Sequence, residues 1–288
     1  MCLVNSFAHL YVSVDVMRLE EDLILKELRE LGLNVLILDS RRTLKINGIV
    51  ESGSLVLIRN ISSVNSIYVA SMVEASGSRA VNSLRALTLG HDKILTYSML
   101  YKKGIRIPET VVLLEGGEIN GSELPLSFPL VDKPPLGSWG RLVSLVKNSD
   151  ALRSIVEYRK RLESPHLRVH VIQEATAIGR DIRCVVVGEE VVACMERRSA
   201  NSEEWRSNAA LGGVAEAVPI TRELEELALK ASEAVEAEIA GVDMLYGRDG
   251  QLLVNEVNVV PEFKTISRVT GVNVAKSIAH YLARTLKS

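Results

Sequence analysis

The chain has 288 residues, of which 47% are hydrophobic and 24% are charged, and its formal net charge is −2. This composition is ordinary for a globular protein, and the length accommodates one large domain or two to three small ones. The near-neutral net charge argues against an overall positive potential that would attract nucleic acid. An aromatic share of 4% argues against a surface on which single-stranded bases stack. We therefore expect no nucleic-acid partner.

Cysteine usage and the apolar runs indicate a cytoplasmic protein without membrane association. Cys2, Cys184 and Cys194 have neither metal-ligand spacing nor an even-numbered framework, which favours a reducing compartment. Cys184 and Cys194 fall in adjacent strand-like runs and are interpreted as small core residues. No apolar stretch approaches the roughly 18 residues that a membrane span requires.

Residues 1–88 are predicted to form a small α/β unit. Its strand–helix–strand order implies a parallel sheet, and Gly32 is suited to end the first helix. The predicted elements, in chain order, are a strand at Leu10–Val16, a helix at Met17–Leu31, strands at Asn34–Leu38 and Leu55–Ile58, and a helix around Tyr68–Glu74.

Residues 89–167 and 168–288 are predicted to form two further lobes with a cleft between them. The central lobe is expected to contain a helix at His91–Lys103, strands at Thr110–Leu114, Phe128–Lys133 and Leu142–Val146, a turn-rich loop at Glu115–Glu123, and a helix at Asp150–Leu162. The C-terminal lobe is expected to contain strands at Val169–Gln173, Ile182–Val187 and Val191–Met195, a polar loop at Ser199–Gly213, a helix at Thr221–Glu238, a hairpin, and a final helix at Val274–Leu286.

The predicted hairpin is the most informative stretch. Its strands are Val242–Met244 and Leu252–Asn258, with turn residues between them. Glu256 and Asn258 are two residues apart and share a face, and Asp243 on the partner strand can join them. Two carboxylates and an amide oxygen suit Mg²⁺, which binds substrate phosphates through one or two carboxylates. The alternative is a solvated polar face on an edge hairpin.

A short glycine-bearing loop between two predicted strands is a candidate phosphate site. Glycines allow backbone N–H groups to approach phosphate oxygens. An arginine can donate two hydrogen bonds to a phosphate, and nearby lysines add positive charge. The loop lacks the Walker pattern and precedes a strand, so on its own it is better explained as an ordinary turn, and each lysine on its own as a surface residue. The residues are Gly137, Ser138, Trp139, Gly140 and Arg141 in the loop, with Lys133 before it and Lys93 at a helix start.

Two further segments carry polar residues at strand ends. Gln173, Glu174 and Ala175 end a strand whose backbone groups can contact an adenine edge, and Asp181 can accept from ribose hydroxyls. A second set is rich in arginine and suits carboxylate or phosphate groups, although a solvated basic patch explains it as well. This set begins with Glu196, Arg197 and Arg198 at a strand end and continues through Glu204, Trp205, Arg206, Ser207 and Asn208 to Gly212 and Gly213. The chain contains no GxSxG, HExxH, CxxC or GxGxxG motif, so hydrolase-triad and nicotinamide functions have no support.

The order of these motifs resembles the ATP-grasp carboxylate–amine ligases, and within them the LysX/ArgX family of the RimK-like branch. The resemblance covers the chain from about residue 10 to its end. It is carried by the segments HDKILTYSMLYKKGIRIPET, DKPPLGSWGRLVSLV, IQEATAIGRDIRCVVVG, EWRSNAALGGVAE and LVNEVNVVPEFKTISRVTGVNVA. It implies an α/β ATP-grasp fold, in which an N-terminal preATP-grasp domain precedes two lobes that clamp ATP.

The resemblance also implies roles for the candidate residues. Phosphates would be bound by Lys93, Lys133 and the loop Gly137–Arg141, and adenine by Gln173, Glu174 and Ala175, with Asp181 near the ribose. Two Mg²⁺ ions would be bound by Asp243, Glu256 and Asn258. Arg206, Ser207 and Asn208 would contact the phosphates and the acyl-phosphate, and Arg183 and Arg197 would bind substrate carboxylates.

The implied activity is ADP-forming ligation in arginine/ornithine or lysine biosynthesis. Glutamate or 2-aminoadipate would be joined through its α-amine to the C-terminal glutamate of the acidic carrier protein LysW, by an enzyme that is a homo-oligomer, either a dimer or a tetramer. The nearest alternative is a RimK-like ligase that adds glutamate to a ribosomal protein or to a deazaflavin cofactor. A non-catalytic ATP-binding module is disfavoured, because all metal and phosphate positions are retained.

Substrate choice depends on Thr265 and Ile266, which match neither the glutamate-type nor the aminoadipate-type pair in the family. If Ile266 points into the pocket, it shortens the pocket and favours glutamate. If Ile266 points into the core, the pocket can accept both substrates, which differ by one methylene. Glutamate is the predicted preference.

Overall fold

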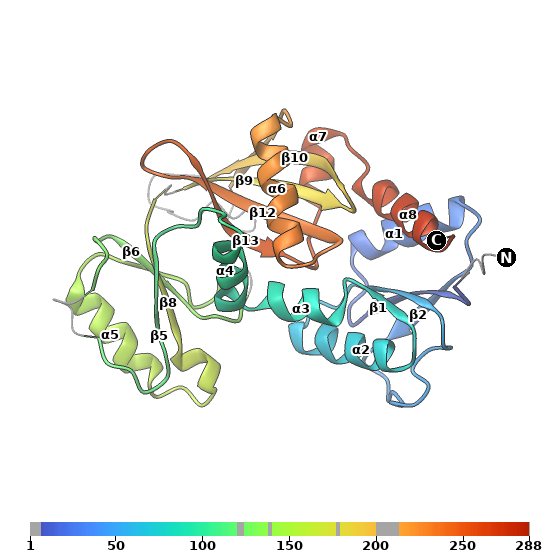
Figure 1. Cartoon of the computed structure of the whole chain (residues 1–288), viewed down its shortest axis with the longest axis horizontal. Coiled ribbons are helices and arrows are strands. Elements are labelled where there is room, and N and C mark those ends of the chain that lie inside the picture. Colours follow the sequence, from blue (N-terminus) through green and yellow to red (C-terminus); the bar gives the residue numbers. More distant parts are fainter. Residues whose placement is uncertain (1–6, 120–123, 138–139, 177–178, 200–212, 288) are drawn as a thin grey trace.

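The protein is described by a computed structural model that covers residues 7–119, 124–137, 140–176, 179–199 and 213–287. Figure 1 shows three β-sheets arranged along the long axis of the molecule. The N-terminal and central sheets lie at opposite ends, and the C-terminal sheet lies between them, so both end units can contribute to a site on it.

The N-terminal sheet is parallel throughout, with the strand order β2-β1-β3-β4, which confirms the predicted β-α-β unit. β2 is an edge strand, and Leu36 and Ile37 on it are exposed. The elements are β1 (Leu10–Val14), α1 (Leu19–Glu30), β2 (Val35–Asp39), β3 (Leu55–Ile58), α2 (Ser63–Ala75), β4 (Arg79–Val81) and α3 (Leu84–His91).

The central sheet is antiparallel, with the strand order β5-β8-β6-β7. Its elements are β5 (Thr110–Leu113), β6 (Leu130–Lys133), β7 (Ser144–Val146), α5 (Ser149–Arg159), the 3₁₀ turn η1 (Pro165–Arg168) and β8 (His170–Glu174). β8 lies between β5 and β6, so this sheet continues beyond residue 167, where the sequence placed the start of the C-terminal lobe. The division into three subdomains stays a proposal.

A helix break separates the N-terminal unit from the central one. The sequence predicts one helix over His91–Lys103, but α3 ends at His91 and α4 (Lys93–Lys102) begins after Asp92. The Asp92 carboxylate accepts from the backbone N–H groups of Ile94 and Leu95 and so caps α4. Asp92 also forms a β-bridge with Leu136, which fixes the start of α4 beside the chain that follows β6.

The C-terminal sheet is antiparallel, with the strand order β11-β10-β9-β12-β13. One face packs on α6 through a core that includes Ile182, Val186 and Ala228. The other face packs on α8, which lies against α1 of the N-terminal unit (Figure 1). The elements are β9 (Arg180–Val187), β10 (Glu190–Arg198), β11 (Val214–Val218), α6 (Arg222–Ala234), β12 (Ile239–Tyr246), β13 (Leu252–Asn258), α7 (Lys264–Thr270) and α8 (Val274–Thr285).

The structure corrects the interpretation of two cysteines. Cys184 on β9 and Cys194 on β10 are opposite each other in the strand register and form a disulfide, rather than standing as separate small core residues. Both are fully buried.

Among the described residues, no helix is both long enough and apolar enough to cross a membrane.

Candidate functional site

The candidate site is built on one face of the C-terminal sheet. Side chains alternate between faces along a strand, and directly opposed residues share a face. On β12 and its neighbours, Asp243 is opposite Arg183 on one side and Glu256 on the other. Arg197 on β10 is opposite Asp181 on β9, on the same face. The predicted hairpin and its partner strands therefore gather three acidic and two basic side chains.

The two arginines bind the carboxylate of Asp243 directly. Arg183 donates from Nε and Nη2 to its two oxygens, each at 2.6 Å, and Arg197 Nη2 lies 3.1 Å from Oδ2. Burial opposes ionisation of Asp243, but the charges of both arginines keep its pKa below the ordinary value. Asp243 is therefore a carboxylate at neutral pH.

Asp181 pairs with one of the two arginines, and its place near a ribose stays a prediction. It is buried, and both its oxygens accept from Arg197 at 2.6 Å. Although burial disfavours the charge of Arg197, Asp243 and Asp181 raise the pKa of its guanidinium. Asp181 thus orients Arg197 over the sheet face.

The expected metal ligands fit Mg²⁺ by their chemistry. Asp243 and Glu256 supply carboxylates, and Asn258 supplies an amide beside them, with Asn258 Nδ2 at 3.4 Å from Asp243 Oδ2. These are the hard oxygen donors that Mg²⁺ takes while it keeps several waters. No group of three His, Cys, Asp or Glu side chains in the described part of the chain is placed to hold a metal, so any metal here rests on two carboxylates and Asn258.

Lys93 connects the glycine loop with the acidic cluster. Its Nζ donates to the carbonyl of Gly137 at 2.8 Å and lies 3.5 Å from Glu256 Oε1. The capped start of α4 places it there, because the N–H of Lys93 also donates to the carbonyl of Pro135. The ammonium of Lys93 thus lies between the glycine loop and Glu256, a candidate metal ligand, where it is well placed to bind phosphate oxygens.

Lys133 is buried at the end of β6. Its Nζ donates to the hydroxyl of Tyr97 at 2.8 Å and to Asn255 Oδ1 at 3.2 Å, and Tyr97 in turn donates to the carbonyl of Asn255. Burial lowers the pKa of Lys133 to about 8, and the charge of Glu256 only partly offsets this. No carboxylate of the described residues is within ion-pair distance of this ammonium, so an anionic ligand would compensate it.

The segment that resembles an adenine-binding hinge is held by several hydrogen bonds. Gln173 is buried and donates to Thr110 Oγ1 at 2.8 Å, and Glu174 accepts from the N–H of Ser127. The N–H of Ala175 donates to the carbonyl of Pro129. The binding of adenine by these three residues stays a prediction.

Several predicted residues lie at the edge of the described part of the chain or beyond it. Gly137 and Gly140 both line the cavity described next, and both have a positive φ that suits glycine. Arg141 follows at an exposed turn. Ser138, Trp139, Arg206, Ser207 and Asn208 lie outside the described residues.

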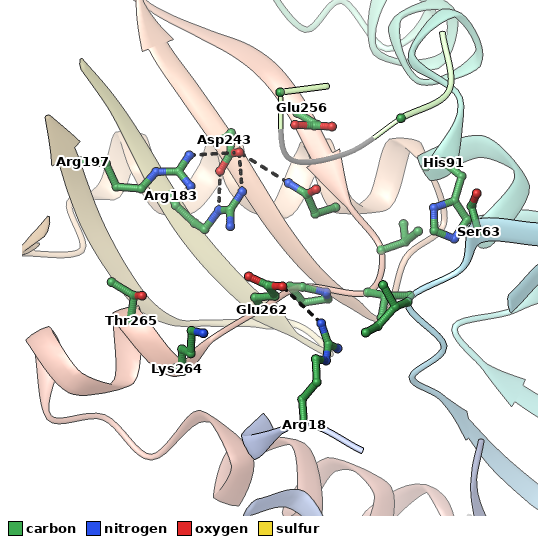
Figure 2. A pocket seen from close by; sticks show the side chains of 18 of the residues that line it. Arg18, Ser63, His91, Arg183, Arg197, Asp243, Glu256, Glu262, Lys264 and Thr265 are labelled. Atoms are coloured by element: carbon green, nitrogen blue, oxygen red, sulfur yellow. Dashed lines mark hydrogen bonds and ion pairs between the residues drawn. The ribbon is translucent and has the colours of Figure 1, made fainter. Parts of the chain in front are cut away.

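A cavity of about 230 Å³ opens over the site face. Figure 2 shows the ion pairs of Asp243 at one end and a second ion pair, between Arg18 and Glu262, at the other. The cavity is lined by Arg183, Arg197, Asp243, Glu256 and Asn258 from the sheet, by Pro261, Glu262, Lys264 and Thr265 after β13, and by Arg18, Ile61, Ser63 and His91 from the N-terminal unit.

Sequence reasoning missed the N-terminal side of the cavity. Arg18 and Ser63 belong to no motif, and their proximity to the hairpin results from long-range packing alone. His91 was seen only as a helix residue. Its Nε2 lies 2.8 Å from Ser66 Oγ, and burial together with the charge of Lys93 lowers its pKa to about 4, so it is neutral at physiological pH.

The position of Ile266 answers the question that the sequence posed. Ile266 on α7 is fully buried in the core that includes Phe263 and Met195, and it does not line the cavity. The neighbouring residues Lys264 and Thr265 do line it. Ile266 therefore does not shorten the pocket, and the steric argument for glutamate is removed.

The chain is similar to known proteins in sequence and in fold. The RimK-like ATP-grasp domain family matches residues 90–282. The chain is 37% identical to a glutamate–LysW ligase, ArgX, from Sulfurisphaera tokodaii over 93% of this chain and 96% of that protein. It is 32% identical to an α-aminoadipate–LysW ligase, LysX, from the same organism over 96% and 98% of the two chains. The solved structure of a RimK-domain ATP-grasp protein from Sphaerobacter thermophilus matches with a TM-score of 0.74 and 24% identity, over 95% of this chain and 99% of that one.

Proposed function

This chain belongs to the RimK-like ATP-grasp family, and from that premise we propose that it is an ADP-forming ligase that joins the α-amine of glutamate to the C-terminal carboxylate of a LysW-type carrier protein. The observation that carries the proposal is the paired arrangement of Asp243 with Arg183 and Arg197 on one sheet face beside Glu256 and Asn258. It places groups that suit metal and phosphate next to groups that suit carboxylates.

The proposed reaction has two steps. The γ-phosphoryl group of ATP passes to the carrier carboxylate, which releases ADP and leaves an acyl-phosphate. The amine of the amino acid then attacks the acyl carbon, which gives an amide, inorganic phosphate and a proton. Such a transfer depends mainly on positioning and on charge neutralisation, and Mg²⁺ supplies part of that neutralisation when bound.

We assign the roles by location. Lys93 and Lys133 contact phosphate oxygens, since one is beside the glycine loop and the other is a buried cation that lacks an ion-paired carboxylate among the described residues. Asp243, Glu256 and Asn258 would hold the two metal ions. Arg183 and Arg197 would exchange part of their pairing with Asp243 for a substrate carboxylate, because a bound metal would take over the neutralisation of Asp243.

The choice of a carrier protein over other acceptors rests on how much of each relative's length this chain matches. The LysW ligase relatives match over nearly their whole chains, whereas the probable α-L-glutamate ligases match over about two thirds of theirs, with 69% of the Picosynechococcus protein covered. A LysW-type carrier is therefore preferred to a ribosomal protein or a deazaflavin cofactor. The oligomeric state and the cytoplasmic location stay predictions.

2-Aminoadipate is the second candidate substrate. The identity is higher to the glutamate ligase than to the aminoadipate ligase, 37% against 32%, which supports glutamate. However, Ile266 lies in the core, so nothing at that position shortens the pocket against one extra methylene. We propose that glutamate is preferred and that 2-aminoadipate is also accepted, within the roughly 10- to 200-fold range that one methylene provides.

The proposal is tested by ADP release with purified protein, Mg²⁺, a LysW-type carrier and each amino acid, with each component omitted in turn. ADP should form only with the complete mixture. Glu256→Gln should lower turnover roughly 100-fold or more, because a carboxylate ligand is lost from the metal-type cluster. Glu189→Gln, at an exposed turn far from the cavity, is the matched control and should retain full turnover. ADP release at the same rate without the carrier, or full activity in Glu256→Gln, contradicts the proposal.

A further inference from the structure

The segment Val259–Lys264, which follows β13 and includes the first residue of α7, forms one wall of the cavity. It lies directly after Asn258 and directly before Thr265, and all but Phe263 of its residues line the cavity. The path of this segment therefore sets the distance between the candidate metal ligands Asp243, Glu256 and Asn258 and the cavity residue Thr265.

Four side chains of the N-terminal unit form hydrogen bonds to four of the six residues of this segment. Asn82 donates to the carbonyl of Val259 at 2.7 Å, and Arg59 donates to the carbonyl of Pro261 at 3.0 Å. Arg18 donates to the carboxylate of Glu262 at 3.2 Å, and Glu20 accepts from the N–H of Lys264 at 3.3 Å. These contacts cross between 177 and 244 residues of sequence, so the wall is a product of two distant parts of the chain.

Arg59 is the central member of this set. It follows β3, its side chain is 1% exposed, and its Nε donates to Glu21 Oε1 at 3.0 Å while Nη2 donates to Pro261. Its guanidinium also lies 5.7 Å from the ring centre of Phe263. The planar guanidinium of Arg59 thus contacts a buried carboxylate, a backbone carbonyl and an aromatic ring at the same time. The ammonium of a lysine cannot make these three contacts in the same geometry.

Glu21 links Arg59 to the cavity. It is fully buried and accepts from Arg18 Nη2 at 2.8 Å as well as from Arg59. Burial alone would raise the pKa of Glu21, but the hydrogen bond from Arg18 and the charge of Arg59 bring it below its ordinary value. Glu21 thereby holds the Arg18 side chain so that its Nη1 donates to Glu262 at the cavity, as Figure 2 shows.

We propose that Arg59 is a positioning residue for the amino-acid substrate: it holds the Val259–Lys264 wall against the N-terminal unit and so sets the shape of the cavity beside Thr265. This inference rests on the proposed ligase function for its kinetic consequence, and on the structure alone for the placement of the wall. Arg59 does not line the cavity itself, so it acts through the segment and not on substrate.

The test compares Arg59→Met with Leu57→Ala. Leu57 is buried on β3 two residues earlier, in the core that also contains Phe263, and its apolar side chain forms no hydrogen bond to the wall, so its truncation weakens the same region without removing such a bond. Arg59→Met should raise the KM for glutamate about tenfold or more, since small misplacements near a reacting group are costly, and should leave the affinity for a non-hydrolysable ATP analogue within about twofold. Leu57→Ala should lower the melting temperature and leave both constants unchanged.

A second measurement does not depend on the ligase assignment. Hydrogen exchange followed by mass spectrometry should show faster exchange in the peptide that contains residues 259–264 for Arg59→Met, and not for Leu57→Ala. If Arg59→Met does not fold, Arg59→Lys keeps the charge opposite Glu21 and loses the planar guanidinium, and the same changes should appear in smaller measure.

The outcomes separate the two proposals. A wild-type protein that releases no ADP with carrier and glutamate contradicts the ligase function, while the exchange result still decides the role of Arg59. An unchanged KM together with unchanged exchange in the folded Arg59 variant overturns the positioning role, as does an equal rise in KM for Leu57→Ala.

Discussion

Lys133 shows how a single residue can cost stability in the free protein and serve binding. A buried ammonium loses hydration, and hydrogen bonds to Tyr97 and Asn255 replace only part of it. Its pKa is lowered to about 8 in the folded protein from an ordinary value of 10.5. The cost to folding is therefore complete at pH values below 8 and disappears as the pH rises toward 10.5.

Replacing this lysine should accordingly stabilise the free protein. Lys133→Met is expected to raise the unfolding free energy at neutral pH by about 1–3 kcal/mol and to abolish the stabilisation that ATP provides. Thermal melting with and without nucleotide measures both effects. Lys103→Met is the control, because Lys103 is exposed and pairs with Glu233 on the surface. A lower melting temperature for free Lys133→Met contradicts this account.

The same residue should make nucleotide binding depend on pH. Phosphate oxygens favour the charged lysine, so affinity should be constant below pH 8 and should fall by up to about tenfold per pH unit above it. Calorimetric titration with a non-hydrolysable ATP analogue on either side of pH 8 measures this. An affinity that does not change across this range would show that Lys133 does not bind the phosphates.

At the scale of elements, α7 separates two roles that the sequence could not distinguish. Consecutive helix residues point in different directions, so Thr265 faces the cavity while Ile266 faces the core. The helix runs from Lys264 to Thr270 and is followed by Gly271, which adopts the left-handed conformation that favours glycine. The sequence analysis placed no helix here, and so left the direction of Ile266 open.

Substitutions on α7 should therefore have opposite consequences. Ile266→Ala should destabilise the protein by about 2–5 kcal/mol through a core cavity and should leave the ratio of kcat/KM for glutamate and 2-aminoadipate unchanged. Thr265→Val, which exchanges a hydroxyl for a methyl group in the cavity, should change that ratio and cost little stability. Chemical denaturation and steady-state kinetics with both amino acids measure these effects. A changed ratio in Ile266→Ala would contradict the assignment of its side chain to the core.

For the whole molecule, local patterns predicted the local structure and long-range packing determined the rest. Alternation and turn residues placed the β12–β13 hairpin and its Asp243–Glu256 pairing, and strand–helix order predicted the parallel N-terminal sheet. The ion pair between Arg18 and Glu262 joins residues 244 positions apart, and no short pattern marks it. The sequence did not indicate that Asp181 pairs with Arg197, because that contact depends on the register of two strands, which places the two residues opposite each other.

The mass of the carrier after reaction tests the central claim most directly. A LysW-type carrier incubated with the protein, ATP, Mg²⁺ and glutamate should gain the mass of one glutamyl residue, at its C-terminus, together with stoichiometric ADP and phosphate. A carrier whose C-terminal glutamate is removed should gain nothing. ADP formation with an unmodified carrier, or modification of the truncated carrier, would contradict the account.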